Sequence, residues 1–524
     1  MRGIAGTSTY LTASLVLAHR TCPAWAWACC HRPEIVPPDS ESTLRREEET
    51  RRVVAIARRR HPEGVAIAVD DADDAARATV AAIADGATTI FDAAVVTPGG
   101  LHARADLLLR EDDGWVLVDI DAATSASTER RFELAVRAAA FVEAGYHIRR
   151  VTIQHLDRRY RRNGHLDLDG LFIEAPMDDW CRAHRREVRA AIDDARRTID
   201  QPECPPCGCD QTTRGRRCPT FSHFHPGFPT GGTVYDLVSI NQPRLAEALG
   251  RGIRRLVDWP ADLKLTARQR WQIDAARTGR ERVKRERLRE FVDAVRFPCW
   301  FLDYETFQTP VPLFSGTWPW QQVPFQYSLH ALHEDGRIEH REFLWTDAGE
   351  PPIAPLVEAL RRDIGDSGSV LVWWKGFEGS RNAELAEAVP HLADFLHDLN
   401  ARMVDLMEPV SRGLWVHPAF GGSTSIKKVL PVVAPELAYD GLEIGHGAVA
   451  TLRWKQCVVD DAPPEGVDPA EAFEQLRVYC RRDTLAMVRI WQHYRELAGV
   501  PGPVRASVGP HSAPGLLPAV QGRL

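Results

Sequence analysis

One segment of the chain, residues 202–233, cannot form part of a hydrophobic core. It combines cysteine, proline and glycine with few apolar residues, so another interaction has to order it. On both sides of it, short apolar runs alternate with stretches of helical period, a pattern typical of mixed sheets covered by helices. The chain has 524 residues, which is enough for two or three domains. We therefore predict a mixed α/β protein with a strand-rich domain on each side of this segment.

Shifts in composition predict four parts. We expect a first domain over residues 1–225, which includes the cysteine-rich segment, and a charged helical connector over residues 226–295. A second strand-rich domain is expected over residues 296–497. Residues 498–524 are rich in proline and glycine and are expected to be disordered.

Charge and hydropathy exclude few functions. The chain carries 65 basic and 72 acidic residues, a formal net charge of −7. It has no run of 18 apolar residues free of charge, so no membrane span is predicted. The N-terminal apolar stretch follows a single arginine and is interrupted by hydroxyl residues, so it matches the pattern of a signal peptide poorly. Eleven cysteines without a repeating framework are typical of a reducing compartment, and we expect a cytoplasmic protein.

Two carboxylates stand close together at the start of the second domain. Asp303 and Glu305 are two residues apart in FPCWFLDYETF, after an apolar run. In a strand these positions face the same side, so their charges repel unless a cation lies between them. Carboxylate oxygens suit Mg²⁺ or Mn²⁺. The alternative is an edge strand with a solvated face.

Further candidate ligands follow in the same domain. Tyr479 and Asp483 lie four residues apart on a predicted amphipathic helix, so both face one side of it. A tyrosine at this position could hold an attacking water against a metal ion. Glu378 stands near the start of another helix, where a third carboxylate can be positioned. Asp405, on or beside an apolar segment, is a further candidate.

The order of these motifs resembles the DEDD exonucleases of the ribonuclease H-like superfamily, in their tyrosine variant. The resemblance implies a ribonuclease H-like fold and hydrolysis of phosphodiester bonds by a two-metal mechanism. Two Mg²⁺ or Mn²⁺ ions would be held by Asp303, Glu305, Glu378 and Asp483. Tyr479 would orient the attacking water. The usual central residue of that family is aspartate, so either the site tolerates the longer Glu378 or Asp405 takes its place.

A loop near the middle of this domain, GGSTSIKKVL, could contact phosphate. Backbone donors around Ser423 and the side chains of Lys427 and Lys428 stand at an expected helix start. A plain helix cap is the alternative. Four tryptophans in the domain could stack bases or pack in the core, namely Trp318, Trp320, Trp373 and Trp374.

The first domain carries a second acidic pattern. Asp106 lies on one predicted strand and Asp119 and Asp121 on the next, an arrangement that resembles the RecB-like, PD-(D/E)XK nucleases. In that family an acid-x-lysine on the second strand binds metal and activates water, whereas Asp121 occupies the lysine position here. No lysine precedes Lys264, and arginine cannot accept a proton. We therefore expect a weak or inactive nuclease site, with three plain surface acids as the alternative.

The cysteines extend this resemblance. Thiolates at the spacing found in ECPPCGCDQTTRGRRC suggest zinc or an iron–sulfur cluster. RecB-like nucleases of the CRISPR-associated and helicase-associated kinds carry an iron–sulfur cluster with one cysteine before the nuclease core and three after it. By that resemblance the ligands are Cys22, Cys207, Cys209 and Cys218. Cys204 is an alternative to Cys207, and His223 and His225 leave a zinc site open.

Together these motifs are similar to a bacterial family of unknown function that fuses a RecB-like domain to a DEDD-type exonuclease domain. We predict a metal-dependent 3′–5′ exonuclease whose C-terminal domain is catalytic. Its partner would be DNA or RNA, with single-stranded ends favoured and phosphates neutralised by arginine clusters. The alternatives are a catalytically decayed protein that binds nucleic acid or assists assembly, and a zinc-stapled scaffold.

Overall fold

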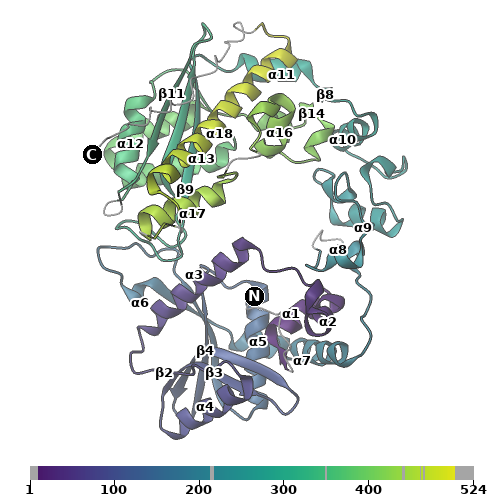
Figure 1. Ribbon diagram of the computed structural model, residues 1–524, viewed down its shortest axis with the longest axis vertical. Coiled ribbons are helices and arrows are strands. Elements are labelled where there is room, and N and C mark those ends of the chain that lie inside the picture. The colour runs from purple at the N-terminus through teal and green to yellow at the C-terminus, as the bar shows by residue number, and fades with distance from the viewer. Residues whose placement is uncertain are drawn as a thin grey trace, which may run out of the picture. The chain divides into compact units, whose positions relative to one another are not determined.

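The computed structural model describes residues 10–212, 217–347, 351–439, 443–460, 462–463 and 466–501 (Figure 1). It is 49% helix and 18% strand, which confirms the predicted mixed α/β class. The chain forms two compact units. Unit 1 comprises Met1–Lys264 and Gln308–Gln322, and unit 2 comprises Leu265–Phe307 and Val323–Leu524. Among the described helices, none is both long enough and apolar enough to cross a membrane.

The boundary between the units falls inside the expected connector of residues 226–295. Its later part forms α10 (Ala267–Thr278) and α11 (Arg285–Asp293), both in unit 2. Leu288 and Val292 of α11 are buried in the core of that unit, so this charged helix is solvated on one face only. The expected disordered tail begins at the end of α18 (Pro469–Ala498), and from residue 502 it lies outside the described residues.

Unit 1 is built on a mixed sheet in the order β2-β3-β4-β5-β6-β7, with β1 (Leu11–Thr12) parallel to β4. The strands are β2 (Val65–Ala66), β3 (Thr89–Val96), β4 (Leu101–Glu111), β5 (Gly114–Asp121), β6 (Ile148–Leu156) and β7 (Phe172–Pro176). β4 and β5 form the predicted antiparallel hairpin. β5 is buried from Gly114 to Ile120, as expected for a continuous apolar run covered on both faces.

Helices cover both faces of this sheet. One core joins the sheet to α1 (Ala13–Thr21), α2 (Pro23–His31), α5 (Thr128–Glu143) and α7 (Asp178–Asp200). A second core lies under α3 (Glu41–Arg58), which buries Val53, Val54 and Ala57 against it. The acidic hairpin is therefore held between two hydrophobic layers.

The segment Gln308–Gln322 leaves the end of β9 (Cys299–Phe307) and packs as part of unit 1. The indole nitrogen of Trp320 donates to the carbonyl oxygen of Ala122 at 2.6 Å. The guanidinium of Arg161 lies 4.1 Å from the ring centroid of Trp318. Both tryptophans thus have contacts within unit 1, and neither lines the acidic cavity described below.

Unit 2 contains a five-stranded mixed sheet in the order β11-β10-β9-β12-β13. The other strands are β10 (Val323–Leu332), β11 (Ile338–Leu344), β12 (Ser369–Val372) and β13 (Met403–Asp405). β10 is antiparallel to both β9 and β11, whereas β12 is parallel to β9 and β13. α18 crosses the sheet over β9 and β10 (Figure 1).

Two helices cover the other face of this sheet, α12 (Ile353–Asp363) and α13 (Lys375–Ala388). Tyr304 of β9 donates to Asn382 of α13 at 2.9 Å, and Tyr327 of β10 donates to Asp363 at the end of α12 at 2.6 Å. Because side chains alternate along a strand, the neighbours of Tyr304 point toward α18 instead.

Polar side chains interrupt the packing of β10 and β11 on α18. Thr484 forms hydrogen bonds of 2.7 Å with both Ser328 and His330, and Ser328 forms one of 2.9 Å with His340. Burial lowers the pKa of His330 to about 3 and that of His340 to about 4. Both imidazoles are therefore neutral in the folded protein at neutral pH.

We expect unit 2 to lose stability as the pH falls from 7 to 5. The unfolded chain takes up a proton on each imidazole near pH 6.5, whereas the folded chain does not until about pH 4 or below, so each costs about 2 kcal/mol at pH 5. Denaturant unfolding at a series of pH values, followed by tryptophan fluorescence, measures this loss. It should be shallower in His330→Gln, and identical pH profiles for variant and wild type would contradict the assignment.

Candidate functional site

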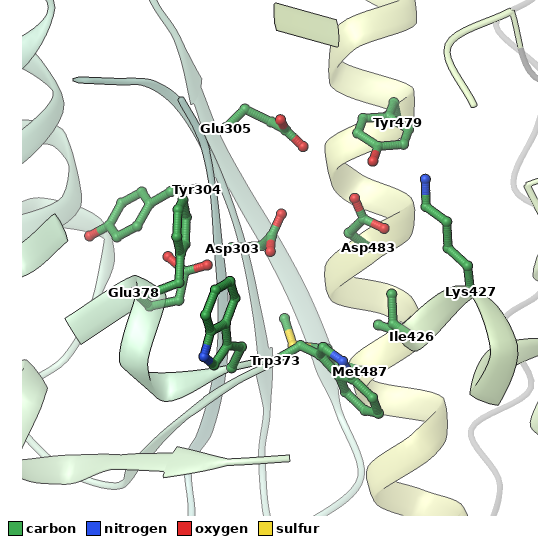
Figure 2. A pocket seen from close by; sticks show the side chains of 12 residues that line it. Asp303, Tyr304, Glu305, Trp373, Glu378, Ile426, Lys427, Tyr479, Asp483 and Met487 are labelled. Carbon is green, nitrogen blue, oxygen red and sulfur yellow. The ribbon is translucent and has the colours of Figure 1, made fainter. Parts of the chain in front are cut away.

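The acids predicted in the second domain meet at one cavity in unit 2 (Figure 2). The cavity has a volume of ≈ 250 Å³. The predicted catalytic residues all line it, namely Asp303, Glu305, Glu378, Tyr479 and Asp483. Figure 2 shows Asp303 between Glu378 and Asp483, with Lys427 beyond Asp483.

Local geometry explains how two elements supply four of these side chains. Asp303 and Glu305 are alternate residues of β9 and share the face that α18 covers. Tyr479 and Asp483 are one turn apart on α18, and both are buried in its apolar stripe. Burying polar residues in such a stripe costs free energy unless they find partners. Here the two side chains lie next to one another and face the cavity.

Glu378 reaches the cavity from the first turn of α13. Asp405 holds the start of this helix, because its carboxylate accepts hydrogen bonds from the backbone N–H groups of Trp374 at 3.1 Å and Lys375 at 3.2 Å. It also accepts one from Met407 at 2.9 Å, and it does not line the cavity. Of the two candidates, the structure therefore places Glu378 with the other acids and Asp405 in a helix-capping role.

The four carboxyl groups lie in a poorly solvated place. Burial raises the pKa of Glu305 to about 8 and that of Asp483 to about 6, and it raises the pKa values of Asp303 and Glu378 well above their ordinary range. For Asp303 the charges of the other three acids add to the effect of burial. Among the described residues that line the cavity, Lys427 is the one cation. From outside the lining, Arg381 acts on Glu378 and Arg482 on Asp483, yet burial still raises the pKa values of both acids.

The donor set fits divalent cations with hard oxygen ligands. One oxygen, Oε2 of Glu378, has no hydrogen-bond partner among the described residues. Glu378 is only 2% exposed, so this oxygen is also shielded from solvent. The backbone of Tyr304 and the charge of Arg381 act on this carboxyl group, but a buried oxygen without a hydrogen bond is still costly, and a bound cation would remove this cost. Carboxylate oxygens are the ligands that Mg²⁺ and Mn²⁺ prefer.

One residue of the site carries no motif that would have identified it in the sequence. The hydroxyl of Tyr439 donates a hydrogen bond to Oδ1 of Asp483. Its ring centroid lies 6.1 Å from that of Tyr479 and 5.1 Å from the ammonium of Lys427. Lys427 in turn donates to the carbonyl oxygen of Gly445 at 2.8 Å. Tyr439 thus holds one oxygen of Asp483, and a hydrogen bond from the hydroxyl of Tyr479 also acts on this carboxyl group.

The residues predicted to contact phosphate separate in the structure. Lys427, near the start of α16 (Ile426–Val433), lines the cavity. Ser423 accepts a hydrogen bond from the backbone N–H of Ser425 at 3.1 Å, in the turn before α16, whose N-cap Ser425 makes no side-chain capping bond, and Lys428 is exposed. Neither lines the cavity. Trp373 and Trp374 do line it, and the side chain of Trp374 is 56% exposed.

Arginines pair with the acids of the hairpin in unit 1. Asp119 is 2% exposed and forms ion pairs with Arg130 and Arg137 of α5, the latter at 2.7 Å. Asp106 accepts a hydrogen bond from the backbone N–H of Ile120 at 2.8 Å and lies 3.8 Å from Arg130. Burial lowers the pKa of Arg130, but the surrounding carboxylates outweigh this effect and raise it. Two guanidinium groups thus neutralise Asp119, where the resemblance places a metal ligand.

The third acid of the hairpin lies outside these ion pairs. Asp121 accepts a hydrogen bond from the backbone N–H of Ala123 at 3.0 Å and is partly exposed. Among the described residues, two groups bring three or more potential metal ligands within 4.8 Å of one another, and neither contains Asp106, Asp119 or Asp121.

Arg137→Met is expected to lower the free energy of unfolding by about 3 kcal/mol, because it leaves the buried Asp119 with one guanidinium partner instead of two. Chemical denaturation of both proteins measures the difference. Arg189→Met is the matched control, since the ion pair of Arg189 with Glu143 is exposed on the arginine side and worth about 1 kcal/mol or less. Equal effects of the two substitutions would contradict the role of the buried pair.

Four thiols meet at the other predicted site of unit 1. The sulfur atoms of Cys22, Cys207, Cys209 and Cys218, here called the cysteine quartet, all lie within 4.8 Å of one another. The sulfur of Cys207 is 3.6 Å from that of Cys22 and 3.8 Å from that of Cys218. A hydrogen bond between Cys22 and Cys218 lowers the pKa of the Cys218 thiol and raises that of Cys22, and burial raises the pKa of Cys207. The quartet could therefore hold a metal ion.

The alternative ligands of this site take other partners. Cys204 donates from its thiol to the carbonyl oxygen of Pro205 at 3.4 Å. A ring nitrogen of His225 forms a hydrogen bond of 3.0 Å with the carbonyl oxygen of Cys207 and so supports the loop rather than the quartet. The group of potential metal ligands around the quartet does not include His223 either.

Comparison with known protein families gives a match to part of the chain. Residues 300–425 match the model of a family described as Domain of unknown function (DUF2779). The chain is similar to that family from β9 to the residue before α16, a segment that includes Asp303, Glu305 and Glu378 but neither Tyr479 nor Asp483. No curated protein and no solved structure matches the chain. The family description carries no activity, so a function has to be argued from the site.

Proposed function

We propose that unit 2 is a metal-dependent nuclease that hydrolyses phosphodiester bonds, acting as a 3′–5′ exonuclease on single-stranded ends. The observation that carries the proposal is the meeting of four carboxylates and a tyrosine at one cavity with a single lining cation among the described residues; Glu305, Glu378 and Asp483 are buried and Asp303 is partly exposed. The mixed sheet, with its acid pair on the first strand and Tyr-x-x-x-Asp on the last helix, supports the resemblance to DEDD exonucleases.

Each residue of the site has a role in this proposal. Asp303, Glu305, Glu378 and Asp483 would hold two Mg²⁺ or Mn²⁺ ions. Such ions supply the charge that activates a water and stabilises the leaving oxygen. Burial and the nearby acids raise the pKa of Tyr479, so its hydroxyl keeps its proton and can orient the attacking water. Lys427 would bind a phosphate oxygen of the substrate.

The arginine-paired acids of unit 1 favour a non-catalytic role for that unit. In this proposal unit 1 binds nucleic acid and unit 2 cuts it. The alternative for the whole chain is a catalytically decayed protein that only binds nucleic acid or assists assembly.

The purified chain can be tested on end-labelled single-stranded and double-stranded DNA and RNA in Mg²⁺, Mn²⁺ or EDTA. We expect stepwise shortening of 5′-labelled single strands in either metal and intact substrate in EDTA. Binding of nucleic acid without metal-dependent shortening of any substrate would favour the decayed protein instead.

For the cysteine quartet we propose a single zinc ion. Four thiolates at about 2.3 Å around a tetrahedral zinc ion lie about 3.8 Å from one another. In a four-iron cluster each thiolate binds a different iron, so the sulfur atoms lie further apart. The distances of 3.6 and 3.8 Å support zinc over the iron–sulfur cluster that the resemblance implies.

A further inference from the structure

A thiol without a role in the proposed mechanism lies beside the acidic cavity. Cys480 follows Tyr479 on α18 and is 1% exposed. Its sulfur and the carboxylate oxygens of Asp303 and Glu305 all lie within 4.8 Å of one another. Tetrahedral ligand atoms about 2.0–2.3 Å from one ion lie about 3.3–3.8 Å apart, so the three atoms are near enough for small side-chain movements to bring them to a shared ion.

The fold itself brings the three residues together. Asp303 and Glu305 share the face of β9 that α18 covers, and Cys480 lies three residues before Asp483 on the same side of that helix. Since Asp303 also lines the cavity with Glu378 and Asp483, the group with the thiol is continuous with the proposed nuclease site.

Two buried oxygens point to a missing ligand at this place. Gln326 lies directly opposite Glu305 in the register of β10 and β9, so their side chains share a face. Its amide nitrogen donates to the carbonyl oxygen of Leu476 on α18 at 3.1 Å, but its Oε1 has no partner among the described residues at 1% exposure. Oε2 of Glu378, at the same cavity, is also without a partner. A metal ion in the cavity would give the oxygen of Glu378 a partner, and Gln326, which is not among the lining residues, adjoins the proposed position through Glu305.

The ligand set decides which metal is preferred. Mg²⁺ takes oxygen ligands, whereas thiolates favour zinc and other softer transition metals. We propose that Asp303, Glu305 and Cys480 form a binding position for Zn²⁺ within the acidic site. When the ion binds, the thiol gives its proton to solvent and a sulfur–metal bond forms, with no change of oxidation state. The proposal rests on the proposed nuclease site in one respect: Zn²⁺ would replace one of its two Mg²⁺ or Mn²⁺ ions and leave the other position to Mg²⁺ or Mn²⁺. The binding of Zn²⁺ itself does not require that function.

Cobalt is the probe that tests this proposal, because Co²⁺ bound to thiolate gives a charge-transfer absorption that Co²⁺ bound to oxygen lacks. The full chain is purified with zinc in the cysteine quartet and titrated with Co²⁺. We expect one further Co²⁺ per chain with thiolate absorption. Cys480→Ser should lose that absorption and bind Zn²⁺ at least about 100-fold more weakly, since even outer-shell changes cost 10- to 100-fold.

Two further variants keep the result interpretable. Cys299→Ser is the matched control, because Cys299 is equally buried in unit 2 but belongs to no group of potential ligands among the described residues. It should keep the absorption. Asp303→Asn keeps the thiol and should still lose the band if one ion is shared. No thiolate absorption beyond the quartet, or the same absorption in Cys480→Ser, would overturn the zinc position. Absence of nuclease activity with the absorption present would overturn only the proposed function.

Discussion

Asp303→Asn is expected to reduce metal-dependent hydrolysis by about a thousandfold or more. Asp303 lies between Glu378 and Asp483 (Figure 2), and the charges of all three other acids act on its carboxyl group. The amide has almost the same shape but carries no negative charge, so it cannot hold a divalent cation as the carboxylate does. Metal ions contribute several kcal/mol to such reactions, and each 1.36 kcal/mol changes the rate tenfold. Initial rates of shortening of a labelled single strand in Mn²⁺ measure the effect.

The control for this variant is Asp394→Asn, an exposed acid in the first turn of α14 (Ala393–Arg402). It removes the same charge from the same unit without touching the cavity. Its rate should stay within about twofold of wild type. Circular dichroism distinguishes loss of the site from loss of the fold. A folded Asp303→Asn protein with the wild-type rate would contradict the assignment of the cavity.

Cys218→Ser is expected to release the metal of the cysteine quartet and to lower the stability of unit 1 by about 4 kcal/mol or more. Apparent binding free energies of structural zinc are about 10–16 kcal/mol in small domains, and binding free energy of this kind is folding free energy. The composition of residues 202–233 predicted a segment outside any core, but Cys209, Cys218 and Phe221 are buried in the core of unit 1. A metal bound by the quartet would hold this packing together. The melting temperature should fall by about 10 °C.

Cys204→Ser provides the comparison for this prediction, because Cys204 lies in the same segment but outside the quartet. It should retain the zinc content and the melting temperature of the wild type, whereas Cys218→Ser should lose one zinc per chain. Metal analysis and thermal unfolding of the two variants are read together. Loss of metal from Cys204→Ser but not from Cys218→Ser would show that the ligands were wrongly chosen. A brown, iron-loaded wild type would contradict zinc.

Short-range patterns predicted the parts of the site that depend on one element. Alternation along a strand placed Asp303 and Glu305 together, and helical spacing placed Tyr479 and Asp483 together. The cysteine spacing, read with the resemblance, predicted the quartet. The strand pair and the helix pair are fixed by spacing within a few residues. The quartet could be predicted because few residue types other than cysteine bind metals in such a segment.

The remaining features depend on contacts between distant segments. The choice between Glu378 and Asp405 rests on which carboxylate accepts the backbone N–H groups at the start of α13. Tyr439 reaches Asp483 across 44 residues of sequence, with no pattern of its own. In the sequence Cys480 resembles any buried cysteine on an apolar helix face. Only the structure shows that it lies beside Asp303 and Glu305 of β9.

Unit 1 shows the same limit of sequence patterns. The missing lysine indicated a weak nuclease site, but the arginines that pair with Asp119 come from the following helix. Trp318 and Trp320 follow β9 closely in sequence and nevertheless pack in the other unit. Closeness in sequence to Asp303 and Glu305 was therefore a poor guide to which aromatic residues surround these acids.

The most direct measurement is anomalous X-ray scattering from crystals soaked in Mn²⁺. The proposal predicts anomalous density in the cavity between the carboxylates of Asp303, Glu305, Glu378 and Asp483, and its absence from crystals of Asp303→Asn. Carboxylates without anomalous density, at a Mn²⁺ concentration that saturates the protein's other metal sites, would contradict the claim that this cavity is a divalent-cation site.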